Sequence, residues 1–186
     1  MNQVIGLKRG TVILRKHHRE WVDAFELERS NLKNLFGNTA IDIQHIGSTS
    51  IPGLVAKPII DILMTVKSLS VVENIRPTLE NVGYEYRGNG SDDRQILFAK
   101  GPEELRTHYL HITEHGSPVW NNDIAFRDYL RTHPETVSAY EKLKKKLATQ
   151  YADKRGDYTA GKAEFIQSIL KVASNPSTPV KTSGIL

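Results

Sequence analysis

The spacing of hydrophobic residues changes between a helical and a strand period along the first third of the chain. Between residues 15 and 36 apolar side chains recur every three to four positions, which predicts an amphipathic helix ending at Gly37-Asn38. Residues 40–46 alternate apolar and polar side chains, as in a strand with one buried face. Residues 58–66 are apolar on both faces, which predicts a buried central strand.

The middle of the chain predicts a helix followed by three strands. Apolar residues at helical spacing indicate a helix over residues 69–81, although Pro77 counts against its second half. Gly101-Pro102 lies between the last two strands and favours a hairpin. The predicted strands are residues 82–87, 94–100 and 107–113.

The C-terminal part is expected to be helical. One apolar face continues from residue 123 to about 151 with a break near His133-Pro134, and a last helix covers residues 159–172. From residue 174 on, Pro, Ser, Thr and Gly dominate, which predicts a disordered tail after a single domain of residues 1–173. The order of elements predicts an α+β fold with a mixed central sheet and helices packed on it.

The composition removes several classes of chemistry. Among the 186 residues there is no cysteine, so disulfides, zinc fingers and thiol catalysis are excluded. Any metal must therefore bind Asp, Glu, His or main-chain oxygen. The first ten residues carry no secretory signal pattern, and no stretch approaches the roughly 20 apolar residues of a membrane helix. We expect a cytoplasmic protein with no membrane partner.

The net charge of +4 permits anionic ligands but is weak support for nucleic-acid binding. The dense basic cluster lies on a predicted helix whose opposite face is apolar, so we interpret it as a solvated face and regard a nucleic-acid partner as unfavoured. That cluster comprises Lys142, Lys144, Lys145 and Lys146.

A stretch of small and polar residues joins the first two predicted strands. The first strand ends in Gly47-Ser48, and the second presents Asp61. Glycine lets the backbone approach a phosphate, to which the N–H groups and the hydroxyls of Ser48, Thr49 and Ser50 can donate. A carboxylate on the neighbouring strand can hold Mg²⁺ or Mn²⁺ against that phosphate. The alternative is a structural turn beside a buried, hydrogen-bonded carboxylate.

Two common motifs do not fit this stretch. A Walker A loop would place a lysine and a Ser or Thr directly after its second glycine, whereas here Lys57 comes four residues after Gly53. The nucleophile elbow of α/β-hydrolases needs a serine between glycines two residues away on each side, and neither serine of the stretch has them.

The run HIGSTSIPGLVAKPIIDI resembles the signature of the GrpB family, which belongs to the nucleotidyltransferase (polymerase-β-like) superfamily and also occurs fused behind dephospho-CoA kinase. The resemblance extends from Val12 to Lys171. It includes Tyr109-Leu-His-Ile, the run FRDYLRTHPETVSAYEKLKKKLA, and Tyr158 with Lys162. It implies the nucleotidyltransferase fold.

The second strand departs from active nucleotidyltransferases, which carry two carboxylates two residues apart. Leu63 stands where the second would be, so one ligand of a two-metal site is missing and plain two-metal transfer is not expected. The resembled family generally shares this single Asp. His111 could compensate: with Asp61 it would bind one divalent metal or move a proton. The alternative is a histidine hydrogen-bonded within the sheet. Strand order, which the sequence does not give, decides whether Tyr109 and His111 face Asp61.

Three cations and one aromatic residue match family positions. Lys57, Arg127 and Lys162 are candidates to meet an anionic ligand, although each could equally form a surface ion pair. Tyr158 could stack on a base, or pack within its helix because it lies four residues before Lys162.

Together these features favour a nucleotidyltransferase-like protein that binds a nucleotide or other phosphate ligand with Mg²⁺ or Mn²⁺. Its reaction would be nucleotidyl or phosphoryl transfer to an unknown acceptor, with Asp61 and His111 as catalytic and metal-binding residues. The alternative is a non-catalytic ligand-binding or folding-accessory module with a protein partner. A nucleic-acid binder rests on charge alone.

Overall fold

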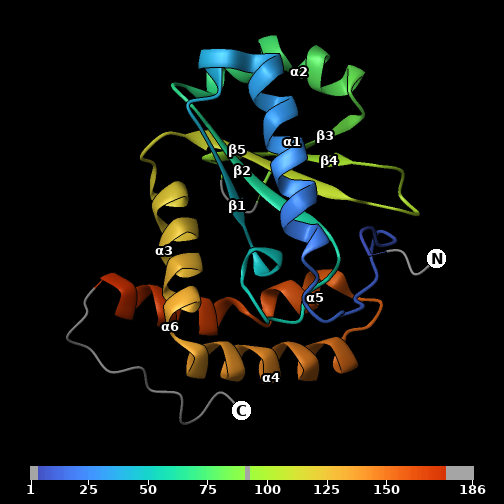
Figure 1. Ribbon diagram of the computed structural model, residues 1–186, viewed down its shortest axis with the longest axis vertical. Coiled ribbons are helices and arrows are strands. Elements are labelled where there is room, and N and C mark those ends of the chain that lie inside the picture. Colours follow the sequence, from blue (N-terminus) through green and yellow to red (C-terminus); the bar gives the residue numbers. More distant parts are fainter. Residues whose placement is uncertain (1–3, 91–92, 175–186) are drawn as a thin grey trace.

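The computed structural model of the protein describes residues 4–90 and 93–174, and a five-stranded mixed sheet lies at its centre (Figure 1). The strand order is β1–β2–β5–β4–β3. The β2–β5 pair is parallel, and the other three pairs are antiparallel. The strands are β1 (Asp42–Ile46), β2 (Ile60–Val66), β3 (Tyr84–Asn89), β4 (Gln95–Lys100) and β5 (His108–Glu114).

Helices lie on both faces of the sheet. One face is covered by α1 (Glu20–Phe36) and α2 (Val72–Asn81). On the other side, α3 (Pro118–Thr132) contacts β1 and β5, and the three helices that follow it lie below the sheet in Figure 1. These are α4 (Pro134–Gln150), α5 (Arg155–Ala160) and α6 (Ala163–Ser174). Short 3₁₀ turns cover Gly37–Thr39, Ser48–Ser50 and Leu69–Val71.

The main hydrophobic core lies between the sheet and α1 and α2. Because side chains alternate along a strand, every second residue of β2 and β5 points to this face. These strand residues pack against the apolar stripe of α1, whose members recur at helical spacing. The core includes Trp21, Phe25, Leu32, Ile60, Ile62, Met64, Leu110 and Ile112.

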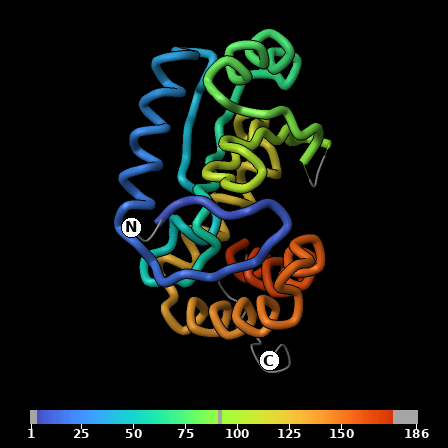
Figure 2. The backbone as a smooth tube through the Cα atoms, turned by 90° about the vertical axis from the view of Figure 1, so that its right-hand side faces the viewer, coloured from blue at the N-terminus to red at the C-terminus, as the bar shows by residue number. Residues whose placement is uncertain are grey.

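A second hydrophobic cluster lies among α3, α4, α5 and α6, and the N-terminal segment joins it to the rest. The cluster includes Leu130, Leu143, Leu147, Phe165 and Ile169. Residues 4–19 run between α1 and the C-terminal helices (Figure 2), with Gly6 N–H donating to the Pro58 carbonyl and Val12 N–H to the Ala152 carbonyl. The sheet and the C-terminal helices are thus tied together through a segment distant from both in sequence.

The α+β fold with a mixed sheet and packed helices is confirmed, and so is the hairpin of β4 and β5. The first helix begins at Glu20 rather than 15, because Arg15 pairs with Ala56 in an isolated bridge. The helix containing Pro77 continues past it to Asn81. The tail predicted from residue 174 lies outside the described residues, except that Ser174 itself ends α6.

The prediction of one last helix over residues 159–172 is wrong, because the chain forms α5 and α6 with a turn between them. Gly161 lies in that turn against the side chain of Leu147. A Cβ at Gly161 would come closer than 3.0 Å to the Leu147 side chain, so glycine permits this contact between the turn and α4.

No helix within residues 4–90 and 93–174 combines the length and the apolar character that a membrane span requires.

A buried carboxylate anchors α1 to the sheet. Glu28 lies on the apolar stripe of α1, where it accepts hydrogen bonds from Tyr84 Oη at 2.8 Å and Lys100 Nζ at 2.7 Å. Burial raises the pKa of Glu28, but the hydrogen bonds from Lys100 and Tyr84 outweigh it and hold that pKa below its ordinary value. The ionised form is therefore the one that stabilises the fold.

We predict that Glu28→Gln lowers the free energy of unfolding at pH 7 by about 1–3 kcal/mol, because it weakens a charged hydrogen-bond network. Because the pKa of Glu28 is lower in the folded than in the unfolded protein, its ionised carboxylate stabilises the fold when the pH is above the unfolded pKa. This stabilisation disappears as the pH falls through the folded pKa. The difference between variant and wild type should therefore shrink in acid. Urea unfolding at several pH values measures it. Glu26→Gln, which removes an exposed ion pair with Arg29, is the control and should cost less than about 0.5 kcal/mol. An equal loss in both variants would contradict the prediction.

Candidate functional site

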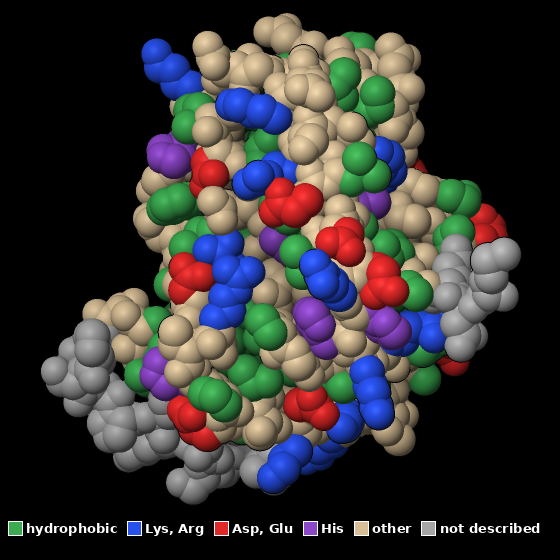
Figure 3. Space-filling view, viewed as in Figure 1, with side chains coloured by type: hydrophobic (Ala, Val, Ile, Leu, Met, Phe, Trp, Pro, Cys, Tyr) green, Lys and Arg blue, Asp and Glu red, His purple; other side chains and the backbone are tan. Residues whose placement is uncertain are grey.

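A cavity of about 920 Å³ lies between the second face of the sheet and the C-terminal helices. Its walls combine residues of all five strands with residues of α3, α4, α5 and α6. Figure 3 shows the outer face that carries α1, where Lys and Arg are interspersed with Asp and Glu. The cavity therefore brings together side chains that are far apart in the sequence.

The Gly-Ser turn lies directly against Asp61. Strand β1 ends at Ile46, which pairs with Asp61 of β2. Gly47 follows with a φ of 65°, and a Cβ there would come closer than 3.0 Å to the Asp61 carboxylate. Glycine is thus required both by the backbone conformation and by the proximity of Asp61. The predicted placement of this turn beside Asp61 is confirmed.

Internal hydrogen bonds fix the turn itself. Ser50 Oγ donates to the Gly47 carbonyl at 2.7 Å, while Thr49 Oγ1 shares a hydrogen bond of 2.9 Å with His45 Nε2. The His45 ring stacks on Phe25, and burial lowers the pKa of His45 to about 4. Gly47, Ser48 and Thr49 line the cavity. Ser50 is outside its lining and acts within the turn instead.

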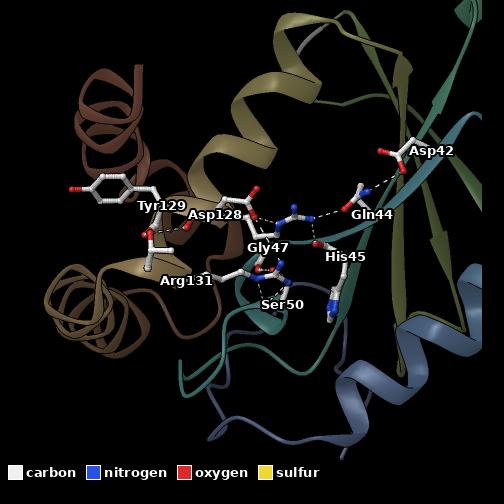
Figure 4. A network of polar contacts seen from close by, with 10 residues as sticks. Asp42, Gln44, His45, Gly47, Ser50, Asp128, Tyr129 and Arg131 are labelled. Carbon is white, nitrogen blue, oxygen red and sulfur yellow. Dashed lines mark hydrogen bonds and ion pairs between the residues drawn. The ribbon is translucent and has the colours of Figure 1, made fainter. Parts of the chain in front are cut away.

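Two arginines of α3 hold both ends of the turn (Figure 4). Arg127 Nη1 donates to Gln44 Oε1 at 2.8 Å and to the His45 carbonyl at 3.1 Å. Arg131 donates through Nε and Nη2 to the Ser50 carbonyl, at 3.1 and 3.0 Å. These hydrogen bonds attach helix α3 to the end of β1 and to the turn. They fix the turn through groups that lie outside the cavity.

The interpretation of Arg127 as a ligand-binding cation is corrected by this geometry. Its guanidinium is buried against Gln44, His45 and Asp128, and it is not among the residues that line the cavity. Arg127 therefore positions the turn.

Strand order places Tyr109 and His111 on the same face as Asp61. In the parallel β2–β5 pair, Asp61 lies opposite Tyr109 and Leu63 opposite His111. His111 Nε2 lies 3.8 Å from Asp61 Oδ1. Burial raises the pKa of Asp61, but its interactions with His111, Lys57 and Arg155 hold that pKa below its ordinary value.

Gln95 of β4 orients the His111 ring. Its Oε1 lies 3.1 Å from His111 Nδ1, and Gln95 is buried. With the amide in this orientation, Nδ1 carries the proton and donates, so the lone pair of a neutral ring at Nε2 points toward Asp61. Sequence reasoning missed Gln95, whose alternation along β4 is the only signal that puts it on the His111 face.

A second carboxylate, Asp123 of α3, also lines the cavity. Burial raises the pKa of Asp123 to about 6, with the Asp61 charge acting in the same direction and His111 opposing it. It was not predicted, because α3 was expected to begin there rather than at Pro118. Within residues 4–90 and 93–174, no group of three His, Asp or Glu side chains is placed to hold a metal ion.

The cavity contains more cations than predicted. Lys57 and Lys162 line it as expected, and Lys144 and Arg155 line it as well. The interpretation of Lys144 as part of a solvated face is wrong: its side chain is 1% exposed, and Nζ donates to the Val55 carbonyl. A sequence signal existed, because Lys144 lies four residues after Tyr140 on the apolar stripe of α4.

Tyr158 is buried at 1% exposure, with Lys57 Nζ 5.4 Å and Lys162 Nζ 4.8 Å from its ring centroid. Tyr158 is among the residues that line the cavity, but its ring is buried and in contact with two lysines. We therefore interpret Tyr158 as a packing residue rather than as a platform for a base.

Comparison with known proteins gives one consistent result. The model of the family described as "GrpB protein" matches residues 11–172. The glutamate-rich protein GrpB of Alkalihalophilus pseudofirmus is 41% identical over 171 residues, covering 90% of this chain and 98% of that protein. The crystal structure of the conserved protein GrpB from Enterococcus faecalis has a TM-score of 0.80 at 37% identity, covering 87% of this chain and 96% of that one.

More distant matches carry other names. Dephospho-CoA kinase of Mycobacterium leprae is 24% identical over 173 residues, covering 78% of this chain and 42% of that protein. The Cid1 poly(U) polymerase with MgGTP bound has a TM-score of 0.49 at 13% identity, covering 72% of this chain and 44% of that one.

We predict that Gly47→Ala destabilises the protein by about 1–3 kcal/mol more than Gly53→Ala, because only the former inserts a Cβ against a neighbouring side chain. Both glycines have positive φ, 65° and 80°, so an alanine is strained at either position. A Cβ at Gly53 meets nothing within 4 Å. Urea unfolding of the two variants measures the difference, and equal losses would show that the Gly47–Asp61 proximity is not constraining.

Proposed function

The chain belongs to the GrpB family, and we propose that it binds a nucleotide or another phosphate-containing ligand, together with Mg²⁺ or Mn²⁺, in the cavity beside Asp61. The reaction we propose is nucleotidyl or phosphoryl transfer to a hydroxyl or amine acceptor. The observation that carries this proposal is the Gly47 turn held against Asp61 at the edge of a cation-lined cavity.

The turn supports phosphate binding through its rigidity. Gly47, Ser48 and Thr49 line the cavity, and the arginines of α3 fix the turn at both ends. Donors that are already in place need no reorganisation when charge develops on a phosphate, which is the usual basis of electrostatic catalysis. Arg127 and Arg131 are positioning residues in this scheme.

Asp61 and His111 suit a metal ion that completes its shell with other ligands. Mg²⁺ and Mn²⁺ retain water and bind phosphate oxygens, so two protein ligands are sufficient. The Nε2 lone pair, fixed by Gln95, and the ionised Asp61 carboxylate converge from neighbouring strands. Such an ion would supply charge neutralisation at the phosphate.

Asp123 is suited to move a proton. It approaches from α3, across the cavity from the sheet, and its pKa of about 6 lies near the operating pH that favours general acid–base catalysis. We propose that the Asp123 carboxylate accepts the proton that the acceptor hydroxyl or amine loses during transfer.

A second function, a non-catalytic ligand-binding or folding-accessory module with a protein partner, is favoured by Leu63. This residue occupies the place of a second carboxylate and is fully buried, so it contributes nothing to a metal site. Product release separates the two functions: an enzyme forms pyrophosphate or phosphate from its substrates, whereas an accessory module binds saturably without turnover.

We predict that a nucleoside triphosphate with Mg²⁺ or Mn²⁺ raises the melting temperature and that Asp61→Asn abolishes this metal-dependent rise. A ligand at about 100 times its Kd stabilises by roughly 2.7 kcal/mol, which a thermal-shift panel detects readily. Asp153→Asn, an exposed site, is the control and should behave as wild type. An unchanged rise in the Asp61 variant would rule out the proposed metal position.

We also predict that Gln95→Leu weakens Mn²⁺ binding by about 10- to 100-fold, because His111 loses the acceptor that fixes its ring. Gln95→Glu retains an acceptor oxygen at this position and should restore most of the affinity. Paramagnetic resonance of free Mn²⁺ measures the dissociation constants, with Gln150→Leu, at an exposed position, as a control. Equal affinity in Gln95→Leu and wild type would remove Gln95 from the site.

A further inference from the structure

Four cations that line the cavity form no ion pair with a carboxylate of the described residues. Arg9, Arg87 and Arg106 also line the cavity, but each forms an ion pair with Glu85 or Glu103. Among the residues that the structure describes, no ion pair to Asp or Glu is formed by the remaining cations, which are Lys57, Lys144, Arg155 and Lys162.

These four side chains come from separate parts of the chain and share common neighbours. Lys57 and Lys162 lie over the ring of Tyr158, and Lys144 Nζ lies 5.3 Å from the ring centroid of Tyr140. Arg155 Nη1 donates to Tyr109 Oη at 2.7 Å. We call Lys57, Lys144, Arg155 and Lys162 the cationic subsite.

The cationic subsite is electrostatically unfavourable by itself. Burial, with repulsion from neighbouring cations, lowers the pKa of Lys57 and Lys144 well below the ordinary value and that of Lys162 to about 8. Buried charges are normally paired, because leaving water without a counter-ion costs several kcal/mol. A bound anion would supply the missing counter-charge.

The aromatic rings of the cavity's tyrosines are in contact with these cations. Arg155 lies 4.7 Å from the ring centroid of Tyr109, and Tyr140 stacks on Phe165 at 5.0 Å in addition to its lysine. Tyr158 has two lysines over its ring. The rings thus orient the cations through cation–π contacts, and none of these three tyrosines serves as a platform for a nucleobase.

We propose that the cationic subsite binds a di- or triphosphate group directly, without a metal ion, and that negative charge rather than the base selects the ligand. The inference rests on the proposed function only in that the phosphate ligand occupies the same cavity. The ligand class is a phosphate compound with several negative charges, whose organic part contributes little to binding.

The test is calorimetric titration with inorganic tripolyphosphate in the presence of chelator. We expect saturable binding to the wild type, affinities for tripolyphosphate, ATP and CTP within about 3-fold of one another, and no binding of adenosine. Each 1.4 kcal/mol corresponds to a tenfold change. A tenfold or greater preference for one base, or binding of adenosine, would overturn selection by charge.

Lys162→Met and Lys144→Met should each weaken tripolyphosphate binding at least tenfold. Lys162→Met should melt at or above the temperature of the wild type, because methionine removes a buried amine without a carboxylate partner at similar volume. Lys144→Met should fold but melt at a lower temperature, because it also removes the hydrogen bond that Nζ donates to the Val55 carbonyl. Lys146→Met, at an exposed position of α4, is the matched control. An equal loss in the control would show that binding depends on net charge rather than on the cationic subsite.

Asp61→Asn separates this inference from the proposed function. The Asp61 charge acts on Lys57, Lys144 and Lys162 and would repel a polyphosphate. Its removal should therefore leave metal-free tripolyphosphate binding equal or tighter, while the metal-dependent binding of nucleotide is lost. If wild type binds nucleotide only with metal and never binds tripolyphosphate in chelator, the cationic subsite is wrong and the proposed function stands. If tripolyphosphate binds and metal changes nothing, the cationic subsite stands and the proposed function fails.

Discussion

The proximity of the Gly47 backbone to the Asp61 carboxylate is the constraint on which the candidate site depends. It exists because β1 ends where β2 begins, with Ile46 paired to Asp61, and because glycine alone permits the positive φ at so small a separation. Any side chain at this point would displace either the turn or the carboxylate. The turn and the charge therefore face the same volume of the cavity.

Helix α3 connects this constraint to the rest of the molecule. Its arginines bind the carbonyls of His45 and Ser50 at the two ends of the turn, and its Asp123 lines the cavity. Two groups of charged side chains line the cavity: Asp61, Asp123 and His111, and the cationic subsite, whose members come from the segment before β2, from α4, from α5 and from the α5–α6 turn. A ligand with several negative charges and a coordinated metal ion would complement both regions.

Much of the site was predictable where it depended on local chemistry. The Gly-Ser turn, Asp61, Lys57 and Lys162 were all predicted, and each lines the cavity. Arg127 was placed wrongly because a cation at a family position looks the same in sequence whether it meets a ligand or a backbone carbonyl. Lys144 was misread because a run of lysines suggests a solvated face, although its spacing from Tyr140 placed it on the apolar stripe.

The sequence alone determined the strands and most helices, since periodicity reports which face of each element is buried. It also determined that no thiol chemistry is available, and it predicted that Gly47 follows one strand and that Asp61 lies on the next. Only the tertiary structure decided that β5 lies beside β2, which brings Tyr109 and His111 to Asp61. It alone placed Gln95, Asp123, Lys144 and Arg155 in one cavity. The physical reason is that a single chain encodes local burial directly, whereas strand order and helix docking arise from packing between segments far apart in sequence.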